Sequence, residues 1–152
     1  MSDLELRDEP YDGPAATSLI AAVQLEYVSR YGGPDETPVD PQDFAPPDGR
    51  FVVGYIDGAP VAMGGVRRHG PDDAEIKRMY VDASCRGRGF SRVVLARLEE
   101  LARELGASRV ILETGHKQPE AMALYESSGY TEIEPFGYYR CEPGSHCYGK
   151  SV

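Results

Sequence analysis

Arg86-Gly87-Arg88-Gly89-Phe90-Ser91 is the stretch of this 152-residue sequence that decides the fold. It stands between a strand-like run over 75–81 and a strongly amphipathic helical run over 90–105. Glycines between a strand and a helix leave backbone N–H groups open at the helix N-terminus, and here arginines alternate with them. The arrangement predicts a loop that holds a phosphorylated ligand.

Hydrophobic periodicity and turn residues divide the rest of the chain into short elements. Helices are expected over 15–31, 90–105 and 119–127. Strands are expected over 4–7, 51–56, 60–66, 74–82, 109–113, 131–134 and 146–149. The segment 35–49 is rich in Pro and Asp, so it is expected to be a loop or a broken short helix.

The connections between these elements predict the topology. Tight turns join the strands between residues 51 and 82, which predicts an antiparallel meander. The 90–105 helix is a crossover between two strands, which predicts one parallel pair. We therefore expect a single domain over 1–152 of the α/β (α+β) class. Its sheet should be mixed and mostly antiparallel, with about seven strands and about four flanking helices. Ligands favour the carboxyl ends of parallel strands, here around 81–91 and 113–118.

Composition narrows the classes of function. A hydrophobic fraction of 41% predicts a folded chain, and a net charge of −9 disfavours nucleic-acid binding. The acidic balance suits a cationic substrate, or simply a soluble surface. Three cysteines, without a signal-peptide or membrane-spanning run, predict a reduced cytoplasmic protein. Cys141, His146 and Cys147 match no common ligand spacing, so no metal is expected.

Two familiar phosphate-binding loops do not fit the stretch. A Walker loop needs Lys followed by Ser or Thr after its last glycine, and the stretch has neither. A dinucleotide-binding turn needs a third glycine, where this chain has Arg92. Glu113 does lie near the distance expected of a ribose-binding acid, but the meander before the loop disfavours a doubly wound sheet.

The same stretch resembles the Arg/Gln-x-x-Gly-x-Gly/Ala signature of the GCN5-related N-acetyltransferases, the GNAT superfamily. The resemblance extends over 51–130. Ala-Glu-Ile-Lys-Arg-Met-Tyr-Val at 74–81 is similar to the family's fourth strand. Leu-Tyr-Glu-Ser-Ser-Gly-Tyr at 124–130 is similar to its Leu-Tyr-x-x-x-Gly-Phe/Tyr ending. Two positions depart from the pattern, since Ser91 replaces the last Gly/Ala and Gln118 stands where many members have Asn.

The resemblance implies an N-acetyltransferase with acetyl-CoA as co-substrate and no metal. The acetyl group would pass to a primary amine by direct attack. The family's fourth and fifth strands splay, so that backbone groups of the fourth meet the pantetheine arm. The implied cofactor-binding residues are Met79, Tyr80, Val81, Arg86, Gly87, Arg88, Gly89, Phe90, Ser91, Gln118, Ala121 and Leu124.

Direct acetyl transfer needs a proton acceptor for the amine and a proton donor for the thiolate. Glu75 lies eleven positions before Arg86, the offset of the strand-four glutamate in the histone acetyltransferase branch, which makes it the candidate base. A glutamate paired with Lys77 or Arg78 would look the same. Tyr125 matches the tyrosine of the Leu-Tyr motif and is the candidate acid, although a packing tyrosine would also fit.

The acceptor is expected to be a small-molecule amine or a peptide amine, with no nucleic acid and no membrane involved. Substrate pockets of the family come from segments that correspond to 15–49 and 136–148, and neither carries a recognisable motif. A homodimer is common in the family. Two other functions stay open at this point: a non-catalytic acyl-CoA-binding module and a nucleotide-binding regulatory domain.

Overall fold

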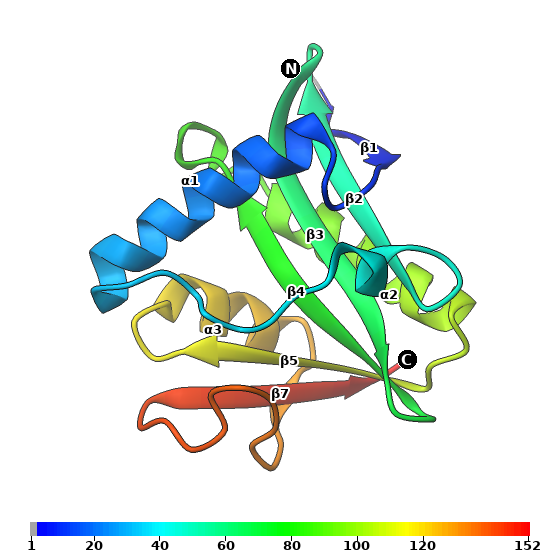
Figure 1. Cartoon of the computed structure of the whole chain (residues 1–152), viewed down its shortest axis with the longest axis vertical. Helices are drawn as coiled ribbons and strands as arrows, with labels where there is room; N and C mark the ends of the chain where they lie inside the picture. Colours follow the sequence, from blue (N-terminus) through cyan, green and yellow to red (C-terminus); the bar gives the residue numbers. More distant parts are fainter. Residues whose placement is uncertain (1–2) are drawn as a thin grey trace.

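Seven strands form one sheet through the middle of the molecule (Figure 1). The computed structural model describes residues 3–152. The strands are β1 Glu5–Asp8, β2 Gly49–Ile56, β3 Ala59–His69, β4 Asp73–Val81, β5 Arg109–Gly115, β6 Thr131–Glu132 and β7 Ser145–Ser151. The helices are α1 Pro14–Tyr31, α2 Phe90–Glu104 and α3 Pro119–Ser127, with 3-10 helices η1 Pro41–Phe44 and η2 Ala83–Cys85.

The sheet has the order β1-β2-β3-β4-β5-β7-β6, and β4–β5 is its parallel pair. The other neighbouring strands are antiparallel. The predicted mixed sheet is therefore confirmed, and the predicted elements differ from the observed ones mainly at their ends. The helix count differs, because the structure has three α-helices and two 3-10 helices in place of about four helices. The 35–49 segment contains η1, the short helical turn that was one of its two predicted forms.

Helices cover both faces of the sheet (Figure 1). On one face, Leu19 and Val23 of α1 pack with Phe44 of η1 against Phe51 of β2. On the other face, α2 and α3 cover the second part of the core. Tyr27 continues the four-residue stripe of α1 beyond the core and lines the cavity described below. The spacing that predicts the helix thus also places its C-terminal half at the site.

The apolar stripe of α2 holds it tightly to β3. Leu98 is fully buried, as is Val94 one turn before it. Leu98 packs directly over Gly64 of β3, where a side chain would clash, because a Cβ added at Gly64 would lie 2.7 Å from Leu98 Cδ1. Helix and sheet therefore meet here at close range, with no space for a side chain between them.

Leu98→Ala is expected to lower the free energy of unfolding by about 2–5 kcal/mol, because it leaves a cavity in this contact. Urea denaturation monitored by circular dichroism measures the change. Val93→Ala in the same helix is the control, since Val93 is 43% exposed and its truncation should change stability by about 0.5 kcal/mol or less. Equal losses for the two variants would contradict the packing described above.

A bulge in β4 opens the sheet next to the parallel pair. On β3, Met63 pairs with Tyr80 and Gly65 with Lys77, so one residue of β3 lies opposite two residues of β4, Arg78 and Met79. Arg78 sits in the bulge with a left-handed φ of 59°. A bulge bends its strand away from its neighbour. The β4–β5 register accordingly ends at Glu75, and the later part of β4 has no pairing with β5.

Candidate active site

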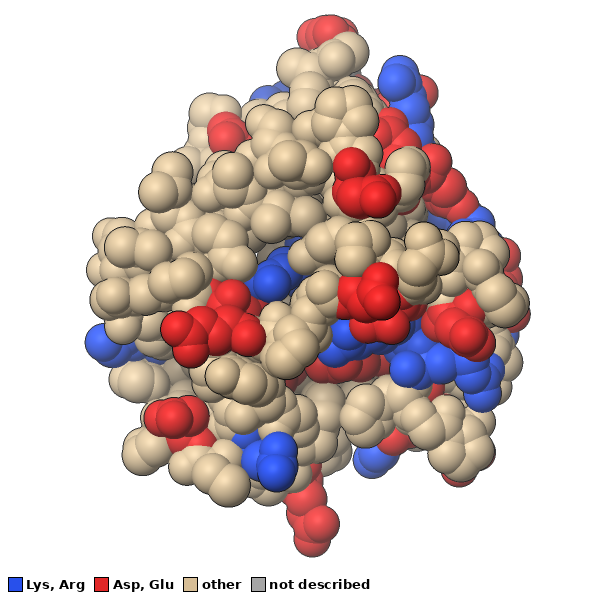
Figure 2. All heavy atoms as spheres, in the orientation of Figure 1, with Lys and Arg blue, Asp and Glu red and all other residues tan. Residues whose placement is uncertain are grey.

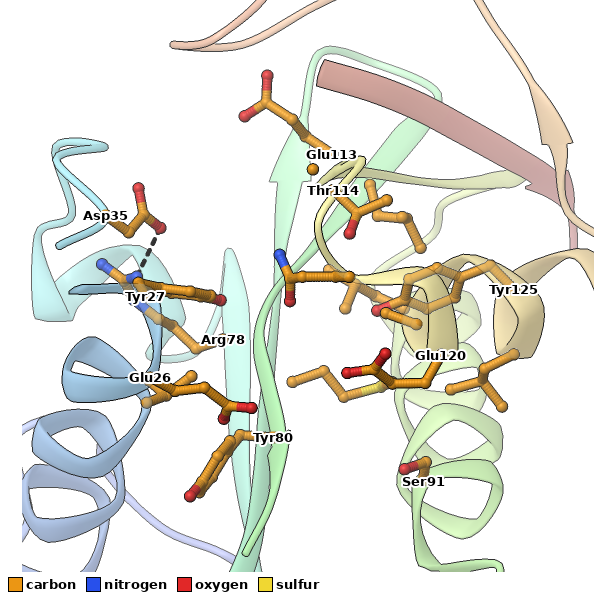
Figure 3. Close-up of a pocket in the computed structure, with 18 of the residues that line it drawn as sticks. Glu26, Tyr27, Asp35, Arg78, Tyr80, Ser91, Glu113, Thr114, Glu120 and Tyr125 are labelled. Carbon is orange, nitrogen blue, oxygen red and sulfur yellow. Dashed lines mark hydrogen bonds and ion pairs between the residues drawn. The ribbon is translucent and has the colours of Figure 1, made fainter. Parts of the chain in front are cut away.

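A cavity of about 1100 Å³ lies where β4 and β5 separate. Figure 3 shows α1 on one side of it and α3 on the other, with the start of α2 nearby. The resemblance implies that the fourth and fifth strands splay apart. In this chain they do so because the pairing of β4 with β5 stops at Glu75. Backbone N–H and C=O groups of β4 that would pair with β5 in a continuous sheet are free to meet a ligand instead.

The predicted phosphate loop connects η2 to α2 at one end of this cavity. Gly87 and Gly89 both have left-handed backbone, with φ of 79° and 82°. A Cβ at either position would meet nothing within 4 Å. Glycine is therefore favoured here because of the left-handed backbone conformation, and not because a side chain would clash. Gly89 is also the N-cap of α2 and supplies no capping side chain. The first N–H groups of α2 are therefore available to an anion.

The cavity brings together most of the residues predicted to contact a cofactor. Arg88 does not line it, because its guanidinium lies outside, over the ring of Phe90 at 4.9 Å from the ring centre. The predicted residues that do line it are Met79, Tyr80, Val81, Arg86, Gly87, Gly89, Phe90, Ser91, Gln118, Ala121, Leu124 and Tyr125.

Arg86 is held at the cavity by contacts that the sequence did not indicate. Its Nε donates to the Val81 carbonyl at 3.1 Å, and its Nη2 lies 2.8 Å from Glu26 Oε2 of α1. Glu26 also pairs with Arg30, which pairs with Glu120 of α3 at 2.5 Å. These ion pairs connect α1, the phosphate loop and α3 around the cavity. Glu26 lies sixty residues before Arg86 in the chain, so only the fold reveals the contact.

Tyr125 lies in α3 with its hydroxyl pointing into the cavity (Figure 3). Tyr125 is 7% exposed, and its ring packs edge-on against Tyr130, with ring centres 5.7 Å apart. Burial raises the pKa of the Tyr125 phenol. The hydroxyl therefore stays protonated at neutral pH and can donate a proton. Both sequence-based readings of Tyr125 describe it, because the ring packs in the core and the hydroxyl faces the cavity.

Glu75 lies in β4 but is not among the residues that line the cavity. It is 4% exposed, and its Oε1 accepts from Arg67 Nε at 3.0 Å. Arg67 in turn pairs with Asp43 at 3.1 Å. The salt bridge expected as the alternative therefore exists, with Arg67 of β3 as partner in place of Lys77 or Arg78.

Glu113 of β5 lines the cavity, although the sequence suggested only a ribose-binding role for it. Within residues 3–152, Glu113 Oε2 and Ser145 Oγ are the buried side-chain polar atoms without a hydrogen-bond partner. Burial and the nearby Glu75 raise the pKa of Glu113, against the opposing charge of Lys77. A buried carboxylate oxygen that lacks a donor is a favourable place for an ammonium group or a water molecule.

Asp35 of the α1–η1 loop neutralises two cations of β4. Its Oδ2 lies 2.6 Å from Arg78 Nη1 and 3.4 Å from Lys77 Nζ. Figure 3 shows the pair with Arg78 at the edge of the cavity. Burial alone would raise the pKa of Asp35, but Lys77, the Thr37 hydroxyl and Arg78 together lower it to about 2. Asp35 is therefore ionised throughout the physiological pH range.

Other features set limits on the site. The described residues contain no group of three or more His, Cys, Asp or Glu side chains that could hold a metal ion. Across residues 3–152, each helix is too short or too polar to cross a membrane. Cys85 and Cys147 are buried and Cys141 is exposed, and all of them are free thiols.

Comparisons with known proteins agree with this geometry. Residues 18–130 match the model of the family described as Acetyltransferase (GNAT) family. The chain is 38% identical over 130 residues to an IAA acetyltransferase of Azospirillum brasilense, covering 81% of this chain and 85% of the relative.

Solved structures show the same fold. A Klebsiella pneumoniae protein assigned as an acyl-CoA N-acyltransferase has a TM-score of 0.82 and 27% identity, covering 98% of this chain and 97% of that one. The PaiA N-acetyltransferase of Thermoplasma acidophilum, solved in complex with coenzyme A, has a TM-score of 0.75. It is 12% identical, and the alignment covers 99% of each chain.

Proposed function

Because the chain belongs to the acetyltransferase (GNAT) family, we propose that it transfers an acetyl group from acetyl-CoA to a primary amine. The observation that carries the proposal is the N-terminus of α2, which has no side-chain cap and lies at the cavity. Gly87 and Gly89, which precede the helix, line the cavity and have left-handed backbone conformations. This loop offers N–H groups to a pyrophosphate, and the splayed strands leave room for an extended arm beside it.

The residues present fit acetyl-CoA. The N–H groups of the phosphate loop and the Arg86 guanidinium supply hydrogen-bond donors and positive charge for the phosphates. Along β4, the backbone of Met79 and the N–H of Val81 lie at the edge that has no β5 partner, where an amide-bearing arm can take up the missing hydrogen bonds. The Val81 carbonyl already accepts from Arg86. Gln118, Ala121 and Leu124 line the α3 side.

Two side chains of the cavity suit the proton transfers of the reaction. We propose that Glu113 receives the amine proton through a water molecule, since its free carboxylate oxygen is buried and its pKa is raised. The amine nitrogen then attacks the thioester carbon, the carbon–sulfur bond breaks, and Tyr125 gives its proton to the thiolate. The second proton of the attacking nitrogen then passes to the Tyr125 oxygen through water, which leaves the neutral amide and restores the hydroxyl. Backbone N–H groups of β4 near Met79 and Tyr80 would polarise the carbonyl oxygen.

Glu75 is the second candidate for the base. It is the residue whose offset from Arg86 fits the family, and its charge acts on Glu113. Its bond to Arg67 and its position away from the cavity favour Glu113 for the direct role. Glu75 as base stays a prediction, which the paired variants in the Discussion test.

Calorimetric titration with acetyl-CoA tests the proposed function, with NAD and ATP as controls. We expect selective binding of acetyl-CoA. Arg86→Ala should weaken it by about 10- to 100-fold, because a charged hydrogen bond to phosphate is lost. Arg88→Ala is the matched control and should change the affinity by less than about threefold, because that side chain lies outside the cavity. Preference for NAD or ATP would support the nucleotide-binding alternative and overturn the proposal.

The remaining features of the proposal concern partners and location. A protein that binds acetyl-CoA but transfers no acetyl group would be the non-catalytic module. The buried free thiols of Cys85 and Cys147 support a reducing compartment, and we propose the cytoplasm. The homodimer that the resemblance implies stays a prediction. The outer face of α1 is largely uncharged in Figure 2, so a second copy would meet little charge repulsion there.

A further inference from the structure

The acceptor end of the cavity is the part away from the phosphate loop. It is lined by residues 35–36, 77–78, 113–116, 139 and 142–145. Under the proposed function the amine binds here, beside Glu113. The charges of this region therefore decide which amines are accepted.

The buried cations of the acceptor end already have an anionic partner. Lys77 is 9% exposed and the Arg78 side chain 4% exposed, and Asp35 Oδ2 contacts both of them. The other bonds of these cations go to hydroxyl groups, since Lys77 Nζ donates to Thr37 Oγ1 at 3.1 Å and Arg78 Nε to Tyr11 OH at 3.3 Å. An acceptor that carries a carboxylate would find both cations occupied.

Asp35 is fixed in this position by its own loop. The Gln24 side chain holds both backbone groups of Asp35, with Asp35 N donating to Gln24 Oε1 at 2.8 Å and Gln24 Nε2 donating to Asp35 O at 3.2 Å. Thr37 donates to Asp35 Oδ1 from its backbone at 2.9 Å and from its hydroxyl at 2.6 Å. The next residue, Glu36, donates its backbone N–H to Tyr139 OH at 2.7 Å. The Asp35 carboxylate is thus held in a fixed position in the lining of the cavity.

Apart from His116, the charged groups of this lining that have no salt bridge are acidic. Glu113 Oε2 has no donor, and the adjacent wall includes Ser145 Oγ, which also lacks a partner. Glu36 and Glu142 are exposed on the same part of the lining. A positively charged group is therefore favoured at this end of the cavity, and a negatively charged one is repelled.

From this arrangement we infer that the acceptor is a cationic amine with no carboxylate beside its amino group, and that Asp35 is the residue that excludes the carboxylate. The inference rests on the proposed function and names its substrate class. An amino acid bound with its amine at Glu113 would place its carboxylate near that glutamate, with Lys77 and Arg78 already paired. Such a carboxylate would lose its water without gaining a partner.

Matched acceptors that differ by one carboxylate test the inference directly. Tyramine and tyrosine form one pair, and histamine and histidine form another, so that each acceptor has a single aliphatic amine. With acetyl-CoA as donor, kcat/KM for acetylation should favour the member without the carboxylate at least about tenfold in each pair. Calorimetry on the protein loaded with coenzyme A should give the same order of acceptor affinities. Equal values, or a preference for the amino acids, would overturn the inference.

Asp35→Asn tests the role of the residue itself. The substitution keeps the shape of the side chain but frees Arg78 and Lys77 to pair with a substrate carboxylate. The preference within each pair should shift toward the amino acid by at least about tenfold. Asp12→Asn makes the same chemical change at an exposed position outside the cavity and should leave the preference unchanged. An active Asp35→Asn protein with an unshifted preference would remove Asp35 from the selection.

The outcomes separate this inference from the proposed function. If the variant does not fold, the acceptor pairs still decide the inference on the wild-type protein. A protein that binds acetyl-CoA but acetylates none of the amines would overturn the acceptor class and leave cofactor binding intact. Failure to bind acetyl-CoA would overturn the proposed function itself.

Discussion

Glu113→Gln is expected to lower kcat/KM for the amine by about 100-fold or more, because the variant cannot accept the proton that the attacking amine must lose. The substitution keeps the size of the side chain, so binding of acetyl-CoA should stay within about twofold of the wild type. Steady-state assays of thiol release, with calorimetry for the donor, measure both quantities.

The dependence on pH gives a more specific test of Glu113. A base works in its deprotonated form, so activity should fall as the pH falls through the pKa of the glutamate. Burial raises that pKa, and the fall should therefore begin closer to neutrality than it would for an ordinary glutamate. Glu113→Gln should remove this fall, which is the acidic limb of the pH–activity profile. The ionisation of the amine itself should still affect the profile.

Glu75→Gln separates the two candidate bases. The side chain is buried against Arg67, so we expect it mainly to lower thermal stability, since Arg67 would lose the charge of its partner. Turnover should fall less than in Glu113→Gln, and the acidic limb should persist. If Glu75→Gln removes the limb while Glu113→Gln keeps it, the base is Glu75 and the assignment to Glu113 is wrong.

These glutamates also show how far the sequence predicts the site. The eleven-residue offset from Arg86 correctly placed Glu75 on β4, but an offset gives no information on the partner of a side chain. The hairpin register contains that information, because Arg67 pairs directly with Glu75 across β3 and β4. Counting outward from residues 69–72 would instead pair Arg67 with Ala74, because the observed loop spans only residues 70–72 and His69 pairs with Asp73. The salt bridge therefore follows from the register of the folded hairpin and not from the turn signal in the sequence.

Other features of the site could not be predicted from local sequence. The helices and strands followed from periodicity, and the phosphate loop from two glycines between a strand and a helix. The bulge at Arg78 has a left-handed backbone at a residue that is not glycine, so no local signal marked it. The contact of Glu26 with Arg86 and that of Asp35 with Arg78 join distant segments, and only the folded chain brings them together.

Tyr125→Phe is expected to lower kcat by about 100-fold with little change in the affinity for acetyl-CoA, because the departing thiolate loses its proton donor. The phenol has a raised pKa owing to its burial, so it stays protonated across the neutral range. Loss of activity should therefore be uniform across that range, in contrast to the pH-dependent effect of Glu113→Gln. Kinetics at saturating amine measure kcat directly.

Tyr148→Phe is the matched control for Tyr125→Phe. Tyr148 is another buried tyrosine, but its hydroxyl donates to Glu126 at 2.8 Å and it does not line the cavity. Removing that hydroxyl should cost about 1 kcal/mol of stability and leave kcat nearly unchanged. If Tyr125→Phe behaves in the same way, Tyr125 serves only to pack α3 against the sheet, and the thiolate must take its proton from water.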